Sequence, residues 1–129
     1  RLKTWLMDRQ GYTLIEMMIV ISIISILATM ALPSFQKSLV RTKETNLRRS
    51  LFIMRDTIDQ YFADHGRYPG SLQDLETEKY IRQTPMDPFT GRSDTWVTIP
   101  PEGFAEGNIY DVHSGSNKVS LDGVPYNEW

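Results

Sequence analysis

The chain contains one long run without charge, and few kinds of structure accommodate it. From Met17 to Leu32 no residue is charged, and the polar residues are Ser22, Ser25 and Thr29. Together with residues 13–15 the run reaches about 20 residues, which at ~1.5 Å per residue spans the ~30 Å hydrocarbon core of a bilayer. The run therefore predicts a membrane-spanning helix. The alternatives are an ordinary signal anchor and a helix buried in a soluble core.

The segment that leads into this run is Gly11-Tyr12-Thr13-Leu14-Ile15-Glu16. A glycine, an aromatic residue, Thr-Leu-Ile and a glutamate, followed at once by an apolar span, resemble the cleavage motif of type IV pilins and type II secretion pseudopilins. In that family a membrane peptidase, the prepilin peptidase, cuts after the glycine and methylates the new N-terminus. The resemblance implies a leader over residues 1–11, cleavage between Gly11 and Tyr12, and N-methylation of Tyr12, where the family usually has phenylalanine. Because the first residue is Arg1, the start of this leader is expected to be truncated or misassigned.

Glu16 stands near the beginning of the apolar run. A charge inside a membrane span costs roughly 2.5–3.5 kcal/mol on insertion scales, so such a residue is a functional candidate. In a bundle of identical helices its carboxylate can meet the N-terminal ammonium of a neighbour, and a misplaced partner would leave an unpaired charge. Glu16 is therefore predicted to set the axial register during assembly. The alternative is a glutamate solvated at the membrane surface.

The apolar pattern resumes after Pro33, so we expect the helix to continue through this proline. In the family a proline near this place marks a bend or local melting, which makes Pro33 a second candidate for a role in assembly. The helix is predicted to end near Asp64, where His65 and Gly66 stop it. A helix from Thr13 to Asp64 would be about 75 Å long, and no compact domain of this size contains it. The apolar positions that recur with helical spacing are Phe35, Leu39, Leu47, Leu51, Met54, Ile58 and Phe62.

Residues 65–129 are expected to form a small α/β head with a C-terminal loop. Ser71 and Asp74 have the spacing of a capping box, and they predict a short helix that runs to about Tyr80. Short apolar or aromatic runs between turn residues predict an antiparallel sheet laid on the long helix. The strand candidates are residues 94–99, 108–113 and 118–121, and residues 102–107 are predicted to be a loop.

The predicted fold class is α+β and pilin-like. A long N-terminal helix, with a transmembrane or filament-core part over residues 12–33 and an amphipathic part over residues 34–64, packs against the small antiparallel sheet of the head. Two runs of the head, Gly66-Arg67-Tyr68-Pro69 and Pro85-Met86-Asp87-Pro88, are more similar to the major pseudopilin of type II secretion than to type IV pilins.

Charge is distributed unevenly along the chain. Residues 1–55 hold nine Lys and Arg against three Asp and Glu, whereas residues 56–129 hold five against thirteen. A basic stem and an acidic head favour stacking of one copy's head against another copy's stem, although a single charge is more often simply solvated. The helix cations are spread around the helix and lack interleaved aromatic residues with a groove-reading motif, so nucleic acid is not a predicted partner. They are Lys37, Arg41, Lys43, Arg48, Arg49 and Arg55.

In major pseudopilins the C-terminal region forms a loop around calcium and ends near a tryptophan. The resemblance therefore implies a calcium loop here, with the oxygens of Ser114, Ser116, Asn117 and Asp122 as candidate ligands. The chain departs from the family pattern because Asp122 is the one clear acid and Lys118 adds a positive charge, and fewer carboxylates mean weaker binding. The alternative is a metal-free loop held by turns and by Trp129 packing inward.

No catalytic motif is recognisable. The chain has no cysteine, and His65 and His113 are its two histidines. The resemblance implies a structural subunit of the periplasmic pseudopilus of a type II secretion system, which is anchored in the bacterial inner membrane with its head in the periplasm. Implied partners are further copies in a homopolymer, minor pseudopilins, the prepilin peptidase, an inner-membrane assembly platform and membrane lipid. The alternatives are a type IV pilin for adhesion, motility or DNA uptake, and a single-pass anchored binding or enzyme domain.

Overall fold

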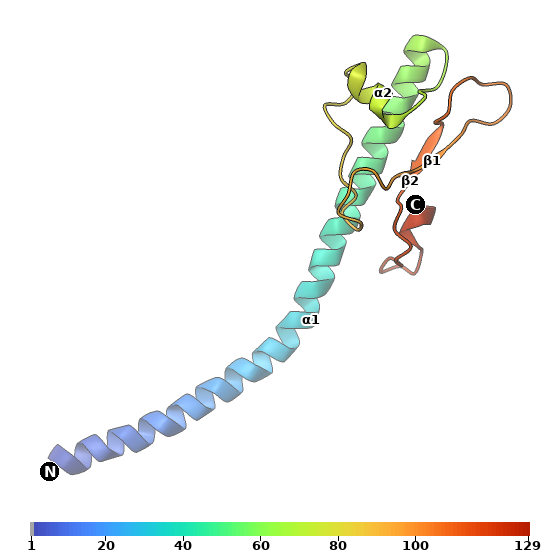
Figure 1. Ribbon diagram of the computed structural model, residues 1–129. Coiled ribbons are helices and arrows are strands. Elements are labelled where there is room, and N and C mark those ends of the chain that lie inside the picture. The colour runs from blue at the N-terminus through green and yellow to red at the C-terminus, as the bar shows by residue number, and fades with distance from the viewer. Residues whose placement is uncertain (1) are drawn as a thin grey trace. The chain divides into compact units, whose positions relative to one another are not determined.

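The structure is a computed structural model that describes the backbone of residues 2–129 and the side chains of residues 13–129. Its elements, in chain order, are α1 (Leu2–His65), α2 (Leu72–Thr77), β1 (Val97–Ile99), β2 (Asp111–His113) and the short 3-10 helix η1 (Tyr126–Glu128) (Figure 1). The chain divides into two compact units, residues 1–39 and residues 40–129. The architecture confirms the predicted α+β class.

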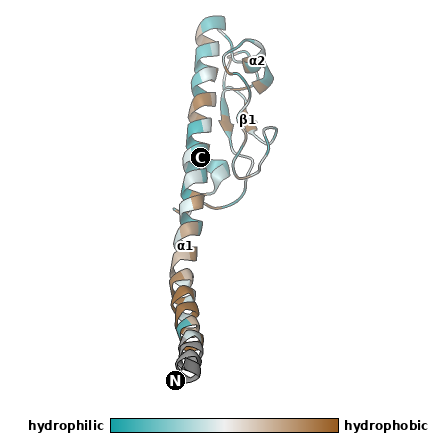
Figure 2. Ribbon diagram, turned by 90° about the vertical axis from the view of Figure 1, so that its left-hand side faces the viewer, coloured by the Kyte–Doolittle hydropathy of each residue, from teal (hydrophilic) through white to brown (hydrophobic). Residues whose placement is uncertain are grey.

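Helix α1 is continuous through Pro33, as expected. It ends one residue beyond the predicted position, because Gly66 adopts the left-handed conformation (φ +69°) and its N–H donates to the carbonyl oxygen of Phe62 at 2.8 Å. Its start differs from the expectation, because the helix already includes residues 2–12. Figure 2 shows the hydropathy of the helix change from the apolar run after residue 12 to a mixed pattern in its later turns.

The core of the head is a stripe along the second half of α1. Leu47, Leu51, Met54, Ile58 and Tyr61 are buried and follow one another at separations of three or four residues. The predicted stripe was too long at both ends, since Phe35, Leu39 and Phe62 remain exposed. The buried residues that cover the stripe from the rest of the head are Leu75, Trp96, Ile109, Val112 and Tyr126.

The predicted capping box opens α2. The backbone N–H of Asp74 donates to Ser71 Oγ at 3.3 Å, and Asp74 Oδ2 accepts from the N–H of Ser71 at 3.2 Å. The helix ends at Thr77 and not near Tyr80, because Lys79 has a positive φ of 62°, which a helix cannot contain.

The sheet has two antiparallel strands, β1 and β2, which pair Thr98 with Val112. Both lie inside predicted strands and are shorter than expected. The prediction of a third strand at residues 118–121 is wrong, because strand-like pairing there is limited to a single bridge between Val119 and Pro125. The chain turns back on itself at this point: Gly123 has a φ of +88°, and its N–H donates to the Ser120 carbonyl oxygen at 3.0 Å.

Candidate functional site

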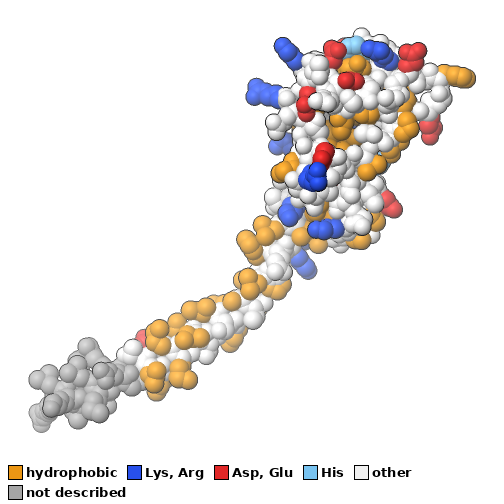
Figure 3. All heavy atoms as spheres, viewed as in Figure 1, with side chains coloured by type: hydrophobic (Ala, Val, Ile, Leu, Met, Phe, Trp, Pro, Cys, Tyr) orange, Lys and Arg blue, Asp and Glu red, His pale blue; other side chains and the backbone are white. Residues whose placement is uncertain are grey.

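The apolar run of α1 has no covering partner in the described part of the chain. Its large side chains are exposed, from 40% for Val20 to 72% for Met30. The helix from Thr13 to His65 is long and apolar enough to cross a membrane, and none of its most apolar window is buried. Figure 3 shows hydrophobic side chains along this part of α1. A helix that is apolar on every side requires lipid or other helices around it.

The polar residues of the run satisfy their hydrogen bonds within the helix. Ser22 and Ser25 donate to the carbonyl oxygens of Met18 and Ile21 at 2.8 and 2.7 Å. Thr29 does the same toward Ile26 at 2.7 Å. Because each hydroxyl finds a local acceptor, these residues do not need water and are compatible with an apolar environment.

Glu16 is the exception in this segment. Its side chain is exposed and forms no ion pair with any residue whose side chain is described. No residue of the described chain therefore neutralises it. The predicted cleavage site between Gly11 and Tyr12 lies within the helical backbone of α1 but outside the residues whose side chains are described.

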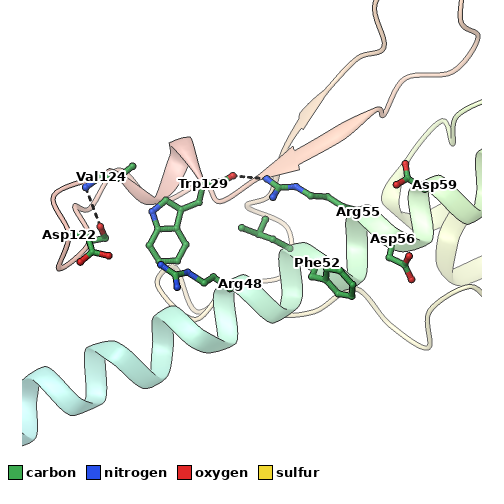
Figure 4. Close-up of a pocket in the computed structure, with 10 residues that line it drawn as sticks. Arg48, Phe52, Arg55, Asp56, Asp59, Asp122, Val124 and Trp129 are labelled. Atoms are coloured by element: carbon green, nitrogen blue, oxygen red, sulfur yellow. Dashed lines mark hydrogen bonds between the residues drawn. The ribbon is translucent and has the colours of Figure 1, made fainter.

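In the head, Arg55 of α1 fastens the C-terminal segment. Its Nε donates to Asp111 Oδ1 at 2.7 Å, and its Nη2 donates to the carbonyl oxygen of Val112 at 2.9 Å. The same Nη2 donates to the carbonyl oxygen of Trp129 at 2.6 Å (Figure 4). His113 Nδ1 lies 2.8 Å from the same Trp129 oxygen. One guanidinium thus joins the sheet and the end of the chain to the helix.

Glu44 and Arg48 complete this attachment from the preceding turns of α1, and we call these two residues and Arg55 the clasp. The buried carboxylate of Glu44 accepts from Tyr126 Oη at 2.8 Å and from the Leu121 N–H at 3.0 Å. The Arg48 guanidinium lies 4.6 Å from the centre of the Trp129 ring, in cation–π geometry. The one sequence signal for the clasp is an acid, Glu44, at the spacing of the apolar stripe.

Two tyrosines have a raised pKa. Burial, together with the hydrogen bond to Glu44, raises the pKa of Tyr126 to about 12. The hydrogen bond from Tyr80 to the Asp64 carboxylate, 2.5 Å long, raises the pKa of Tyr80 to about 12 as well. In both cases a neighbouring carboxylate disfavours the phenolate.

The four predicted calcium ligands lie in two different settings. Ser114 is fully buried and donates to Asp87 Oδ2 at 2.5 Å, and Ser116 is buried beside it with its N–H donating to Ser114 Oγ. Asn117 and Asp122 are exposed. Among the described residues no three His, Asp or Glu side chains come together at metal-binding distance. The donor set is therefore poor for a hard cation, and calcium binding stays a prediction.

A pocket of about 500 Å³ lies beside the clasp, between α1 and the C-terminal segment. Arg48, Leu51 and Phe52 line it from the helix, and Val124 and Trp129 from the C-terminal segment (Figure 4). Acidic side chains also border it. They are Asp56, Asp59 and Asp122.

The histidines make structural contacts. His65 stacks on Tyr61 with ring centres 4.1 Å apart, and its Nε2 lies 3.7 Å from Glu78. His113 contacts Trp129 and Asp111, whereas the neighbouring Ser114 bonds to Asp87. The adjacent His113 and Ser114 are thus engaged with different partners.

The chain is similar in sequence to several known proteins. Residues 6–32 match the family model described as the prokaryotic N-terminal methylation motif. The chain is 38% identical to the fimbrial protein EcpC of Eikenella corrodens over an alignment of 104 positions, which covers 77% of this chain and 68% of that protein. It is 33% identical to the type IV major alpha-pilin of Moraxella bovis over 117 residues (88% and 73%).

A third relative is named for a secretion system and not for a fimbria or pilus. The type II secretion system core protein G of Klebsiella michiganensis is 28% identical over an alignment 134 positions long, gaps included, which covers 92% of this chain and 87% of that protein. No solved structure matches the chain significantly.

Proposed function

Because the chain belongs to the family of type IV pilins and pilin-like proteins, we propose that it is a structural subunit of the periplasmic pseudopilus of a type II secretion system. It polymerises through α1, and growth of the filament drives protein export across the outer membrane. Before assembly the apolar run of α1 anchors the subunit in the inner membrane, with the head in the periplasm. Minor pseudopilins, a prepilin peptidase and an inner-membrane assembly platform are its partners.

The observation that carries this proposal is the apolar run of α1. Its side chains are exposed on all sides over residues 17–32, and the polar groups among them are satisfied locally. Such a surface has two favourable environments, a bilayer and a bundle of similar helices. A subunit that moves from the first to the second needs no new apolar surface, because the same side chains serve in both.

Glu16 gives this transfer a defined register. The carboxylate has no ionic partner in its own described chain. Cleavage after Gly11 would make Glu16 the fifth residue of the mature chain and create a positively charged N-terminus, and a neighbouring copy can present that charge to the carboxylate. An unpaired charge in an apolar bundle is costly, so a copy that docks out of register is rejected.

The choice of a secretion pseudopilus rests on the relatives named core protein G, which align with most of the chain, head included. A type IV pilin is the second candidate, and the higher identities to EcpC and to the Moraxella bovis pilin favour it. Deletion in the native organism distinguishes the two. Loss of secreted enzymes from the medium with surface filaments intact supports the pseudopilus, and the reverse result supports the pilin.

Mass spectrometry of the N-terminus tests the shared part of the proposal. We expect the mature chain to begin with N-methylated Tyr12 and to be recovered in filaments. A chain that keeps residues 1–11, or that is cut elsewhere, would exclude both candidates and leave a single-pass anchored domain.

A further inference from the structure

The loop between β1 and β2 projects from the head (Figure 1). It carries an aromatic side chain without cover. Phe104 in this loop is fully exposed, and the acids Glu102 and Glu106 on either side of it are exposed as well. Neither acid forms an ion pair with any described residue. We call residues 102–106 the knob. A fully exposed phenylalanine between two unpaired carboxylates gains contacts only from another molecule.

The base of this loop is fixed although Phe104 is free. The Tyr68 N–H donates to the Glu106 carbonyl oxygen at 2.8 Å, and the Asn108 N–H donates to that of Pro69 at 3.1 Å. Gly107 has a φ of +114°, and a Cβ at this position would lie 2.2 Å from the Tyr68 carbonyl oxygen. The base of the loop is therefore fixed before any partner arrives, which lowers the entropic cost of binding.

The same head carries a surface that complements the knob. The pocket beside the clasp is lined by Phe52, which is 70% exposed, and by Val124 and Trp129. Arg48 borders it, and Arg41 lies on the same helix face because positions 41, 48 and 52 are seven and four residues apart. Arg49 is exposed next to them, and none of these three arginines is ion-paired with a described residue.

The acids at the pocket define the direction of approach. Asp56 and Asp59 follow Phe52 along α1, whereas Arg41, Arg48 and Arg49 precede it, and on that side the C-terminal segment adds a single acid, Asp122. An acidic loop is repelled by Asp56 and Asp59 and attracted by the three arginines. The knob is therefore expected to enter from the arginine side, with Glu102 and Glu106 toward the guanidinium groups and Phe104 against the aromatic lining.

We propose that Phe104 of one copy docks into the Arg48–Phe52–Trp129 pocket of a second copy. This inference deepens the proposed function and rests on it, since it names the contact between heads in the filament. The two surfaces are different patches of one chain, so the contact is heterologous. Each copy that offers its knob keeps its own pocket open, and such contacts extend into a filament unless they close into a ring.

Cysteine pairs test this contact directly, because the chain has no cysteine of its own. Phe104→Cys is combined with Phe52→Cys, and filaments formed in cells with the assembly machinery are oxidised and separated on a denaturing gel. We expect a ladder of covalent multimers. Phe104→Cys paired with Met86→Cys, at another exposed position that does not line the pocket, is the matched control and should give no ladder.

A mixture of two single-cysteine variants tests the same contact more strictly. Filaments that combine copies carrying Phe104→Cys with copies carrying Phe52→Cys should give dimers and nothing larger, since each copy then has one reactive surface.

The substitution Phe104→Ala should raise the concentration needed for assembly by roughly tenfold or more, as for an aromatic interface residue. Val97→Ala, at a half-exposed strand position, should leave it unchanged.

Two failures are distinguishable. Normal filaments without the 104–52 ladder, or with an equal ladder in the Met86 control, would overturn the knob-and-pocket contact and leave the proposed function intact. Unmodified protein that is processed but forms no filament would overturn the proposed function, and this inference with it.

Discussion

The apolar run of α1 and the head treat their apolar side chains in opposite ways: the run exposes them and the head buries them. Between residues 13 and 32 the chain satisfies its backbone and hydroxyl groups internally and exposes almost all of its apolar surface. In residues 40–129 the apolar stripe is covered, and buried polar groups are paired within the same chain, as Glu44 is with Tyr126 and Leu121. The head thus buries its core within one chain, whereas the run requires lipid or other copies. Substitutions in the apolar run should therefore affect filament assembly, and substitutions in the head should affect the free energy of unfolding.

The largest effect is expected from Glu16→Ala. If the carboxylate pairs with the N-terminus of a neighbouring copy, breaking that pair costs about 3–5 kcal/mol, which corresponds to a loss of assembly of roughly a hundredfold or more. The yield of sheared filaments measures assembly, and mass spectrometry checks that cleavage is intact. Thermal unfolding of the head should not change.

Ser22→Ala is the control for this variant, since its hydroxyl bonds within the helix. Its filament yield should equal that of the unmodified chain. Glu16→Ala filaments of normal yield and normal helical register would place the glutamate at a solvated surface and would remove the ionic part of the assembly mechanism.

Met54→Ala is expected to have the next largest effect, and in the other region. The side chain is fully buried between the helix and the sheet. Truncation should lower the free energy of unfolding by about 2–5 kcal/mol, because it removes apolar contacts and leaves a cavity. Near-ultraviolet circular dichroism of the full chain in detergent follows the transition.

The adjacent Ile53→Ala is the matched control, because Ile53 is 39% exposed. It should change the free energy of unfolding by about 0.5 kcal/mol or less, as surface substitutions do. Equal losses in the two variants would mean that the stripe on α1 is not the organising core of the head.

Short-range sequence patterns were sufficient to predict much of this fold. Helical spacing predicted the buried Leu47, Leu51 and Met54, and the Ser71–Asp74 box predicted the start of α2. What the sequence analysis missed depends on partners distant in sequence. Arg55 clasps residues more than fifty positions away, and the spacing of apolar residues contains no information about such a contact.

The functional residues also divide into those that the sequence identifies and those whose roles depend on partners distant in sequence. Glu16 stands out because a charge at the start of an apolar run is costly, so the sequence alone identifies it. Among the clasp residues Glu44 falls at the spacing of the apolar stripe, whereas Arg48 and Arg55 look like ordinary charges of an amphipathic helix. Their roles become visible when the positions of Tyr126 and Trp129 are known.

A smaller effect, within the clasp, is expected from Tyr126→Phe. The Glu44 carboxylate loses one of its two hydrogen bonds and keeps that from the Leu121 N–H, which should cost about 1–2 kcal/mol. Urea unfolding of the two proteins at neutral pH measures the difference. Tyr110→Phe, at a half-exposed tyrosine, is the control and should be neutral.

The advantage of Tyr126 over phenylalanine should also depend on pH. Its pKa in the folded head is raised to about 12 from an ordinary value of 10. A raised pKa means that the folded state holds the proton more tightly, so the stabilisation is fully present below pH 10 and is lost as the pH rises toward 12. The difference between Tyr126 and Tyr126→Phe should shrink over that window. A difference that is constant up to pH 12 would contradict the bond to Glu44.

The smallest effect is expected from calcium. The proposed ligands supply one exposed carboxylate, that of Asp122, and Ser114 already bonds to Asp87. A dissociation constant near 1 mM, typical of weak extracellular sites, would stabilise the head by about 0.4 kcal/mol at 1 mM calcium. Thermal unfolding with calcium or with a chelator measures this, and Asp122→Asn should remove the difference. If the chelator instead unfolded the head, the clasp of Glu44, Arg48 and Arg55 would be insufficient to hold the C-terminal segment. The head would then depend on an outside partner just as the apolar run does.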